Sequence, residues 1–175
     1  QEDLDKFYAI VVAAAENGWQ LNEHSSRDVK IRAMLDVFER VNETHPITDL
    51  RWTIAHNNTT SQESAQRAMD LGMMFAVHSS RRNVSAEQAQ SGGEDGLHQP
   101  PISTIDELGG IWGLGSDATT VASPNPMHTL GWAVSGRSGS GQVTLVDTVS
   151  REAALIAHTR TNAYTLFRED DLGSL

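Results

Sequence analysis

The sequence predicts an α/β fold in which four parallel strands alternate with helices. Segments with the 3.6-residue period of a helix alternate along the chain with short apolar runs of strand length, and this alternation is typical of βα units around a parallel sheet. Three of the predicted strands lead into a histidine and the fourth leads into an aspartate. In α/β barrels, the carboxyl ends of the strands are where catalytic groups gather.

The first half of the chain contains three helix–strand units. Each helix has apolar residues on one face, and glycines at Gly18 and Gly72 stop two of them. The predicted elements are a helix over 4–15, a strand over 19–23 before His24, a helix over 28–41, a strand over 50–55 before His56, a helix over 61–71 and a strand over 73–77 before His78.

The second half contains one more unit and further helices. Residues 81–99 are polar and contain glycines, so we expect a mobile loop with one short helix, which is the best candidate for a lid. Ser150 is a good N-cap for a last helix. The remaining predicted elements are a helix over 102–108, a strand over 111–114, a helix over 126–135, a Gly/Ser turn over 137–141 and the last helix, through to about 167.

Composition excludes several classes of protein. The chain has 175 residues, 13 basic and 23 acidic side chains and a net charge of −10, which argues against nucleic acid as a partner. No apolar stretch approaches the ~20 residues that span a bilayer, so we expect no membrane contact, and with no targeting signal visible the expected location is the cytoplasm. The absence of cysteine excludes thiolate metal sites.

The residues that end the four strands are the candidate site. If the strands close into a barrel, His24, His56, His78 and Asp117 converge on one cavity. Neutral imidazole is a good zinc ligand, and a carboxylate is either a ligand or a proton acceptor. Any one strand-end histidine, taken alone, also fits a polar loop residue. Trp112, on the last strand, is a candidate for the pocket wall.

Two further choices stay open at this point. His78 is either a substrate contact or a plain loop residue. Asp28 is either catalytic or a carboxylate favoured by the N-terminal end of a helix, and we prefer the second. The remaining histidines are expected to have no chemical role: His45, His98, His128 and His158.

Several motifs resemble the amidohydrolase superfamily, in its formamide-deformylase-like branch (amidohydrolase family 3). The most specific is Ser116-Asp117-Ala118-Thr119 within the run SDATTVASPNP, which resembles the last barrel strand of that family. The other matching segments are Arg51 to His56 as an Arg-x-x-Ile-x-His pattern, His24 with Asp28, Thr161-Asn162-Ala163, and Gly173-Ser174-Leu175 as the start of an appended β-sandwich.

The resemblance implies an architecture and an activity. Residues 1–147 would form half of a (β/α)8 barrel, strands five to eight, and residues 148–175 a C-terminal helix with the start of a β-sandwich. The activity would be metal-dependent hydrolysis of an amide or related C–N bond in a small molecule. His24 and His56 would hold a divalent metal, with zinc expected, and Asp117 would be the general base and then the acid. His78 and Trp112 would contact substrate.

The departures from the family pattern are also informative. Its first strand supplies a His-x-His pair, which occurs nowhere in this chain. The chain begins without Met, and it ends where a β segment is expected to continue, so we expect a fragment of a longer protein. Two histidines and one carboxylate fall short of the usual catalytic zinc site. We therefore expect the chain by itself to bind metal weakly and to catalyse poorly.

Two alternatives belong to other functional classes. A catalytically incompetent half-barrel would expose strand edges, which invite pairing with a second copy in a homo-oligomer that serves as a structural or binding unit. A flavodoxin-like sugar- or phosphate-binding protein would need a Gly-rich loop that opens a helix, and no convincing one is present.

Overall fold

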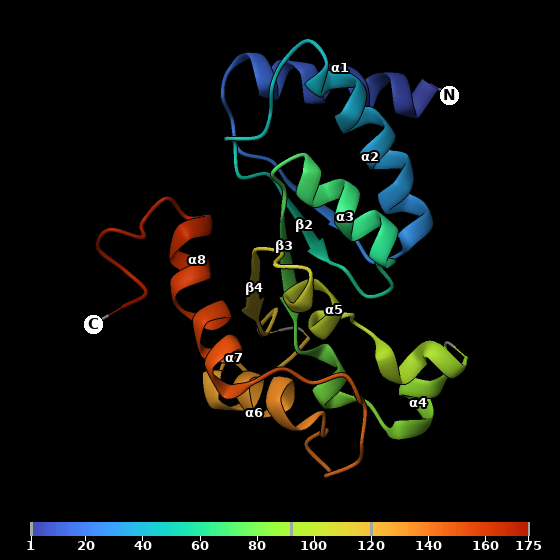
Figure 1. Ribbon diagram of the computed structural model, residues 1–175. Helices are drawn as coiled ribbons and strands as arrows, with labels where there is room; N and C mark the ends of the chain where they lie inside the picture. The colour runs from blue at the N-terminus through green and yellow to red at the C-terminus, as the bar shows by residue number, and fades with distance from the viewer. Residues whose placement is uncertain (1, 92, 120, 175) are drawn as a thin grey trace.

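A four-stranded parallel sheet lies at the centre of the molecule. The computed structural model describes residues 2–91, 93–119 and 121–174. The strands pair in chain order, β1-β2-β3-β4 (Figure 1). They span Asn22–Ser25 (β1), Thr53–His56 (β2), Met74–His78 (β3) and Trp112–Gly115 (β4). The predicted α/β fold with four parallel strands is therefore confirmed.

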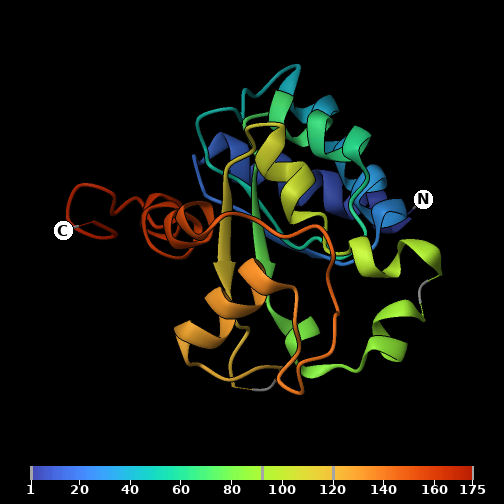
Figure 2. The same ribbon diagram turned by 60° about the horizontal axis from the view of Figure 1, so that its bottom comes forward.

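Helices lie on one face of this sheet, at its carboxyl end and beside β4, which α7 and α8 contact. The helix α1 packs on α2 and α2 packs on α3, while α6 and η1 lie near the carboxyl ends of β3 and β4, below the arrowheads in Figure 2. The helices are α1 (Glu2–Glu16), α2 (Asp28–Asn42), α3 (Gln62–Asp70), η1 (Ser80–Asn83), α4 (Ala86–Gln90), η2 (Glu94–His98), α5 (Ile102–Glu107), α6 (Pro126–Ser135), α7 (Arg151–His158) and α8 (Arg160–Thr165). Among the described residues, no helix combines the length and the apolarity that a bilayer crossing requires.

The two faces of the sheet differ in side-chain size. Side chains alternate between the faces along a strand, and registered neighbours share a face. One face packs against the helices and forms the hydrophobic core, with Ile54, Phe75 and Leu114 each at most 1% exposed. The other face carries Ala55, Ala76 and Gly113, which are neighbours in register. The small side chains of this inner face leave room for a cavity.

The first predicted strand is displaced toward the C-terminus. We expected it over 19–23, but β1 begins at Asn22. The cause is the end of α1: the Gly18 N–H donates to the Ala15 carbonyl and the Trp19 N–H to the Ala14 carbonyl. This is a helix-terminating turn with Gly18 at a φ of 64°. Trp19 belongs to that turn and is 61% exposed.

Three other predicted elements also differ from the structure. The strand expected over 50–55 begins only at Thr53, because Arg51 has a left-handed φ of 51°. The single helix expected to about residue 167 divides at Thr159 into α7 and α8, since Thr159 leaves the helical region at ψ −80°. The expected loop over 81–99 contains three short helices, and Ser85 and Gln88 form a capping box for α4.

The expected β-sandwich start is not a strand where the structure describes it. Gly173 and Ser174 follow a series of turns after α8, and Leu175 lies outside the described residues.

Candidate metal centre

Three side chains from neighbouring strands meet at the carboxyl end of the sheet. His56, His78 and Asp117 each offer one ligand atom, and these atoms lie within 4.8 Å of one another. His56 Nδ1 and His78 Nε2 are 2.7 Å apart, so one ring donates a hydrogen bond to the other. His78 is 9% exposed, His56 is half-buried and Asp117 is exposed. The group thus extends from the sheet interior to the solvent.

The backbone of His56 directs its ring into this group. Ile54, two residues earlier, faces the helices, and continued alternation would send His56 to the same side. Instead His56 has a left-handed φ of 78°, which is unusual for a residue with a side chain. Its ring lies 4.3 Å from that of His78 between centroids. Asp117 likewise has a left-handed φ, of 53°.

The predicted ligand His24 lies beside the group, although it is not a member of it. Its ring centroid is 4.2 Å from that of His56, at an interplanar angle of 68°. His24 is exposed, and it pairs in register with Ala55, which places it on the inner face. The structure thus brings together His56, His78 and Asp117, with His24 against the outer side of His56.

Burial keeps the two inner histidines neutral. Burial lowers the pKa of His78 to about 4, helped by His56 and opposed by the charge of Asp117. Burial, together with His24, also lowers the pKa of His56. Both imidazoles are therefore uncharged near pH 7, which is the form that coordinates a metal ion.

The donor atoms fit a divalent transition metal. His78 Nδ1 is buried and has no hydrogen-bond partner among the described residues, although buried polar atoms are nearly always paired. Two imidazoles and a carboxylate are ligands that zinc accepts. Their chemistry thus agrees with the expected metal.

A cavity of about 230 Å³ adjoins the group along the inner face. Its walls are small, with Ala55, Ala76 and Gly113 among them, and Asn162 of α8 closes one side. Trp112, predicted to contact substrate, is not part of these walls: it is 4% exposed in the core and its indole N–H donates to Asp106. None of the described residues of 81–99 lines this cavity.

Asn162 lines the cavity although the sequence did not predict it as a site residue. Its side-chain amide donates to the Leu114 carbonyl at 3.0 Å and to the His158 carbonyl at 3.1 Å. A Cβ at Gly113 would lie 2.4 Å from Asn162 Oδ1. The glycine before the Asp117 segment is the sequence signal for this close approach.

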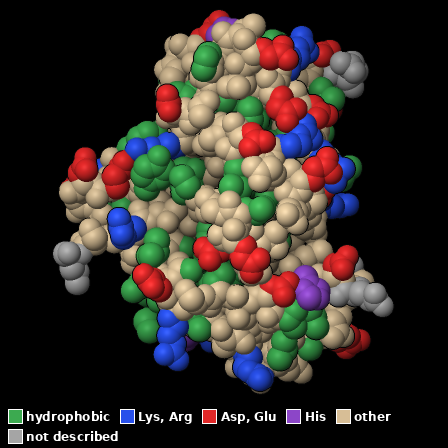
Figure 3. Space-filling model, viewed as in Figure 1, with side chains coloured by type: hydrophobic (Ala, Val, Ile, Leu, Met, Phe, Trp, Pro, Cys, Tyr) green, Lys and Arg blue, Asp and Glu red, His purple; other side chains and the backbone are tan. Residues whose placement is uncertain are grey.

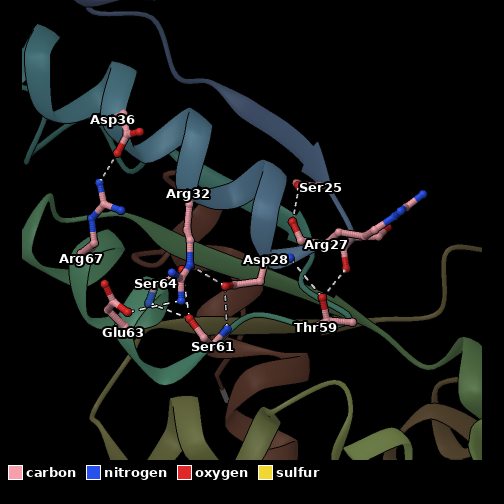
Figure 4. A network of polar contacts seen from close by, with 11 residues as sticks. Ser25, Arg27, Asp28, Arg32, Asp36, Thr59, Ser61, Glu63, Ser64 and Arg67 are labelled. Carbon is pink, nitrogen blue, oxygen red and sulfur yellow. Dashed lines mark hydrogen bonds and ion pairs between the residues drawn. The ribbon is translucent and has the colours of Figure 1, made fainter. Parts of the chain in front are cut away.

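Asp28, four residues after His24, has a structural role. Its carboxylate accepts hydrogen bonds from the Ser61 N–H at 2.8 Å and from Arg32 at 2.7 Å, within the network of Figure 4. Burial raises the pKa of Asp28, but the hydrogen bonds from Ser61, Ser64 and Arg32 outweigh it and lower the pKa. The preferred interpretation as a helix-end carboxylate is confirmed, because Asp28 lies in the first turn of α2.

Arg51, the first residue of the Arg-x-x-Ile-x-His pattern, lies at the opposite end of β2 from His56. Its guanidinium contacts both carboxylate oxygens of Glu169 at 3.0 and 2.5 Å. The same group stacks on the rings of Tyr164 and Phe167, 3.6 and 4.2 Å from their centroids. Arg51 therefore attaches the C-terminal segment to β2 and does not reach the candidate metal centre.

Comparison with known proteins identifies one family. A family model described as "Amidohydrolase family" matches residues 1–175. No curated protein matches the chain.

Solved structures share the fold. Crystal structures of uncharacterized metal-dependent hydrolases from Pyrococcus horikoshii OT3 and Pyrococcus furiosus superpose with TM-scores of 0.77 and 0.76, at 18% and 19% identity, over 98% of this chain and 34% of theirs. Atrazine chlorohydrolase from Arthrobacter aurescens TC1, complexed with zinc, superposes with a TM-score of 0.61 at 20% identity, over 97% of this chain and 36% of its own. The chain thus spans about a third of the length of the structures it matches.

Proposed function

The chain belongs to the amidohydrolase family, and from this premise we propose that it supplies half of a metal-dependent hydrolytic site for amide or related C–N bonds in small molecules. We further propose the formamide-deformylase-like branch of the family and zinc as the metal. The observation that carries the proposal is the group formed by His56, His78 and Asp117 within 4.8 Å at the carboxyl end of a parallel sheet.

The two inner histidines would hold the metal. The short distance between His56 Nδ1 and His78 Nε2 and the two neutral rings support this assignment. His24 is the next candidate ligand, since its ring already contacts His56. A bound divalent cation supplies activation of water and polarisation of the scissile carbonyl.

Asp117 would move the proton. As the exposed carboxylate of the group, it can accept a proton from the attacking water and then donate it to the leaving nitrogen. The cavity beside it, bounded by alanines and glycines, gives room for a small acyl group. Structures with a similar fold, which include a metal-dependent hydrolase and an enzyme complexed with zinc, support the reaction class.

Titration with Zn²⁺ tests the metal assignment. We expect His56→Ala and His78→Ala each to weaken zinc binding by about tenfold or more, because each removes a ligand. His24→Ala reports whether the third ring is also a ligand. His45→Ala, at the far end of α2, is the matched control and should bind as the unaltered chain does. Isothermal titration calorimetry measures all four variants. A zinc affinity in His56→Ala and His78→Ala equal to that of the unaltered chain would contradict the assignment.

Substitution of Asp117 tests the chemical step. At saturating zinc, any hydrolysis of a formamide or a simple N-acyl amine should fall in Asp117→Asn by roughly 10²- to 10⁴-fold, because an amide cannot take up the proton. Initial rates of amine release measure this. A variant as active as the unaltered chain would remove Asp117 from the mechanism.

A further inference from the structure

A second cavity lies away from the candidate metal centre, between η1, α6 and the turn that follows α6. It has a volume of about 340 Å³, and its walls include Arg82, His128, Trp132, Arg137, Ser138 and Gly139. We call it the arginine cavity. A neighbouring cavity of about 300 Å³ shares Arg82, Ser138 and Gly139 with it.

Unpartnered buried atoms distinguish this cavity. Among the described residues, three buried side-chain atoms have no hydrogen-bond partner: His78 Nδ1, His128 Nδ1 and Trp132 Nε1. The first lies in the candidate metal centre, and the other two belong to side chains that line the arginine cavity. Trp132 is 1% exposed, and its indole N–H can only donate. A buried donor without an acceptor is rare and calls for a ligand or water that would supply one.

The charge of the cavity is positive. Among the residues that the structure describes, Arg82 and Arg137 line it and no aspartate or glutamate does, in a chain whose net charge is −10 and whose acidic side chains are spread over the face in Figure 3. Elsewhere, Arg32, Arg51 and Arg67 each contact a carboxylate. Two guanidinium groups without a carboxylate attract an anion.

Backbone groups of the turn after α6 contact both arginines. The Gly139 N–H donates to the Arg82 carbonyl at 2.8 Å, and a Cβ at Gly139 would lie 3.2 Å from Arg82 Nη1. The absence of a side chain there leaves space beside the Arg82 guanidinium. Arg137 donates to the Gly141 carbonyl at 2.7 Å, which fixes the second guanidinium at the other side of the same turn.

We propose that the arginine cavity binds a small oxyanion, a carboxylate or a phosphate. Its oxygen atoms would accept hydrogen bonds from Arg82, Arg137 and the Trp132 indole, and the neighbouring cavity would hold the rest of the ligand. The proposal is independent of the hydrolytic function, because none of these residues belongs to the group formed by His56, His78 and Asp117.

The indole N–H resonances of the chain test the proposal directly. Inorganic phosphate is titrated into the ¹⁵N-labelled protein against sodium chloride of equal ionic strength, with Trp132→Phe used to assign the signal. We expect a saturable shift of the Trp132 indole signal. The Trp52 and Trp112 indoles should stay in place, because they already donate to the Trp19 carbonyl and to Asp106. A shift that does not saturate, or that is equal in all three signals, overturns the proposal.

Charge variants give the second measurement. Arg82→Gln should weaken phosphate binding about tenfold, whereas Arg27→Gln, which removes an exposed arginine at the N-terminal end of α2, should leave it unchanged. If Arg82→Gln and Arg27→Gln bind phosphate with equal affinity, the proposed anion site is contradicted. If Arg82→Gln does not fold, the phosphate titration of the Trp132 indole signal in the unaltered chain is the test of the proposal. Repeating the titration with sodium acetate distinguishes the source: binding of phosphate alone indicates a phosphoryl group, and binding of acetate indicates a carboxylate.

Discussion

The left-handed backbone at His56 determines which side chains form the candidate metal centre. Its φ of 78° moves the ring from the helix-facing side of β2 to the inner face, where it meets both His24 and His78. Such conformations cost of order 1 to 3 kcal/mol and persist where the surrounding structure enforces them. Here Asn57, which is fully buried, donates to the Ile54 and Ala76 carbonyls and fixes the turn that follows.

Asp28 gives a prediction about pH at the scale of a single residue. Hydrogen bonds hold the pKa of Asp28 below its ordinary value of 3.8. The unfolded chain therefore binds this proton more readily, so the stabilisation is complete well above pH 3.8 and is lost as the pH falls through the folded-state pKa. Asp28→Asn should unfold at lower urea concentration than the unaltered chain at pH 7, by about 1 to 2 kcal/mol.

The size of that difference should itself depend on pH. The difference should narrow as the pH falls below 3.8 and should vanish only below the folded-state pKa, where Asp28 is protonated in both the folded and the unfolded state. Urea denaturation at pH 7, 5 and 3 measures the effect. Asp170→Asn, which removes an exposed carboxylate, serves as the control and should show no difference at pH 7. A difference in unfolding free energy between Asp28→Asn and the unaltered chain that stays constant down to pH 3 would contradict the lowered pKa of Asp28.

At the scale of elements, the contact between α8 and β4 is the one that positions Asp117. Asn162 donates to the Leu114 carbonyl, three residues before Asp117. Gly113 leaves the space that the Asn162 side chain fills. The end of the last strand is thereby fixed by a helix that comes much later in the chain.

Substitution of Gly113 tests this contact. In Gly113→Ala the new methyl group would lie 2.4 Å from Asn162 Oδ1, so we expect a loss of stability of about 1 to 3 kcal/mol. Gly131→Ala, in α6, places its methyl group where nothing lies within 4 Å and should stabilise by about 0.5 to 1 kcal/mol. Thermal unfolding compares the two variants.

A double variant distinguishes the clash with Asn162 from a general effect of the methyl group added at residue 113. If the clash is the cause, adding Asn162→Ala to Gly113→Ala should cost less than the sum of the two single changes. Strictly additive effects would mean that the two residues do not act on each other.

At the scale of the whole molecule, the two edges of the sheet differ. The outer edge of β4 faces α8, and its Leu114 carbonyl is hydrogen-bonded to Asn162. Leu21, just before β1, and Ser25, at its end, accept hydrogen bonds from the Thr53 and Asn57 N–H groups through their carbonyls. The backbone N–H and C=O of the exposed Asn22 therefore face away from the sheet. An unpaired strand edge is available to a second copy of the chain.

This difference predicts how the purified chain associates. If the second hypothesis, a self-associating unit, is correct, light scattering will show a mass above the 19.1 kDa of one chain. Asn22→Pro should shift the chain toward the monomer, because proline removes an outward N–H from the edge. Circular dichroism checks that the variant is folded. A single species at the mass of one chain would contradict the hypothesis.

The sequence predicted the sheet better than it predicted the site. Apolar periodicity placed four strands in parallel order, because burial on the helix side is a local pattern. It did not locate β1, whose position follows from the turn that ends α1 at Gly18. It placed His78 among the converging strand ends but as a substrate contact rather than a ligand, since the contact of its ring with His56 depends on the left-handed φ of His56. Trp112 was expected in the pocket, but strand alternation turns it toward Asp106 in the core.

The fit between Gly113 and Asn162 has a consequence for how this chain can change over time. Neither position can vary freely, since a side chain at residue 113 takes the volume that Asn162 Oδ1 occupies. Drift at the two sites is therefore coupled: a lineage that acquires a larger residue at 113 must acquire a shorter one at 162. In related sequences the two positions should be inherited as a pair, and that correlation would be recognisable without any structure.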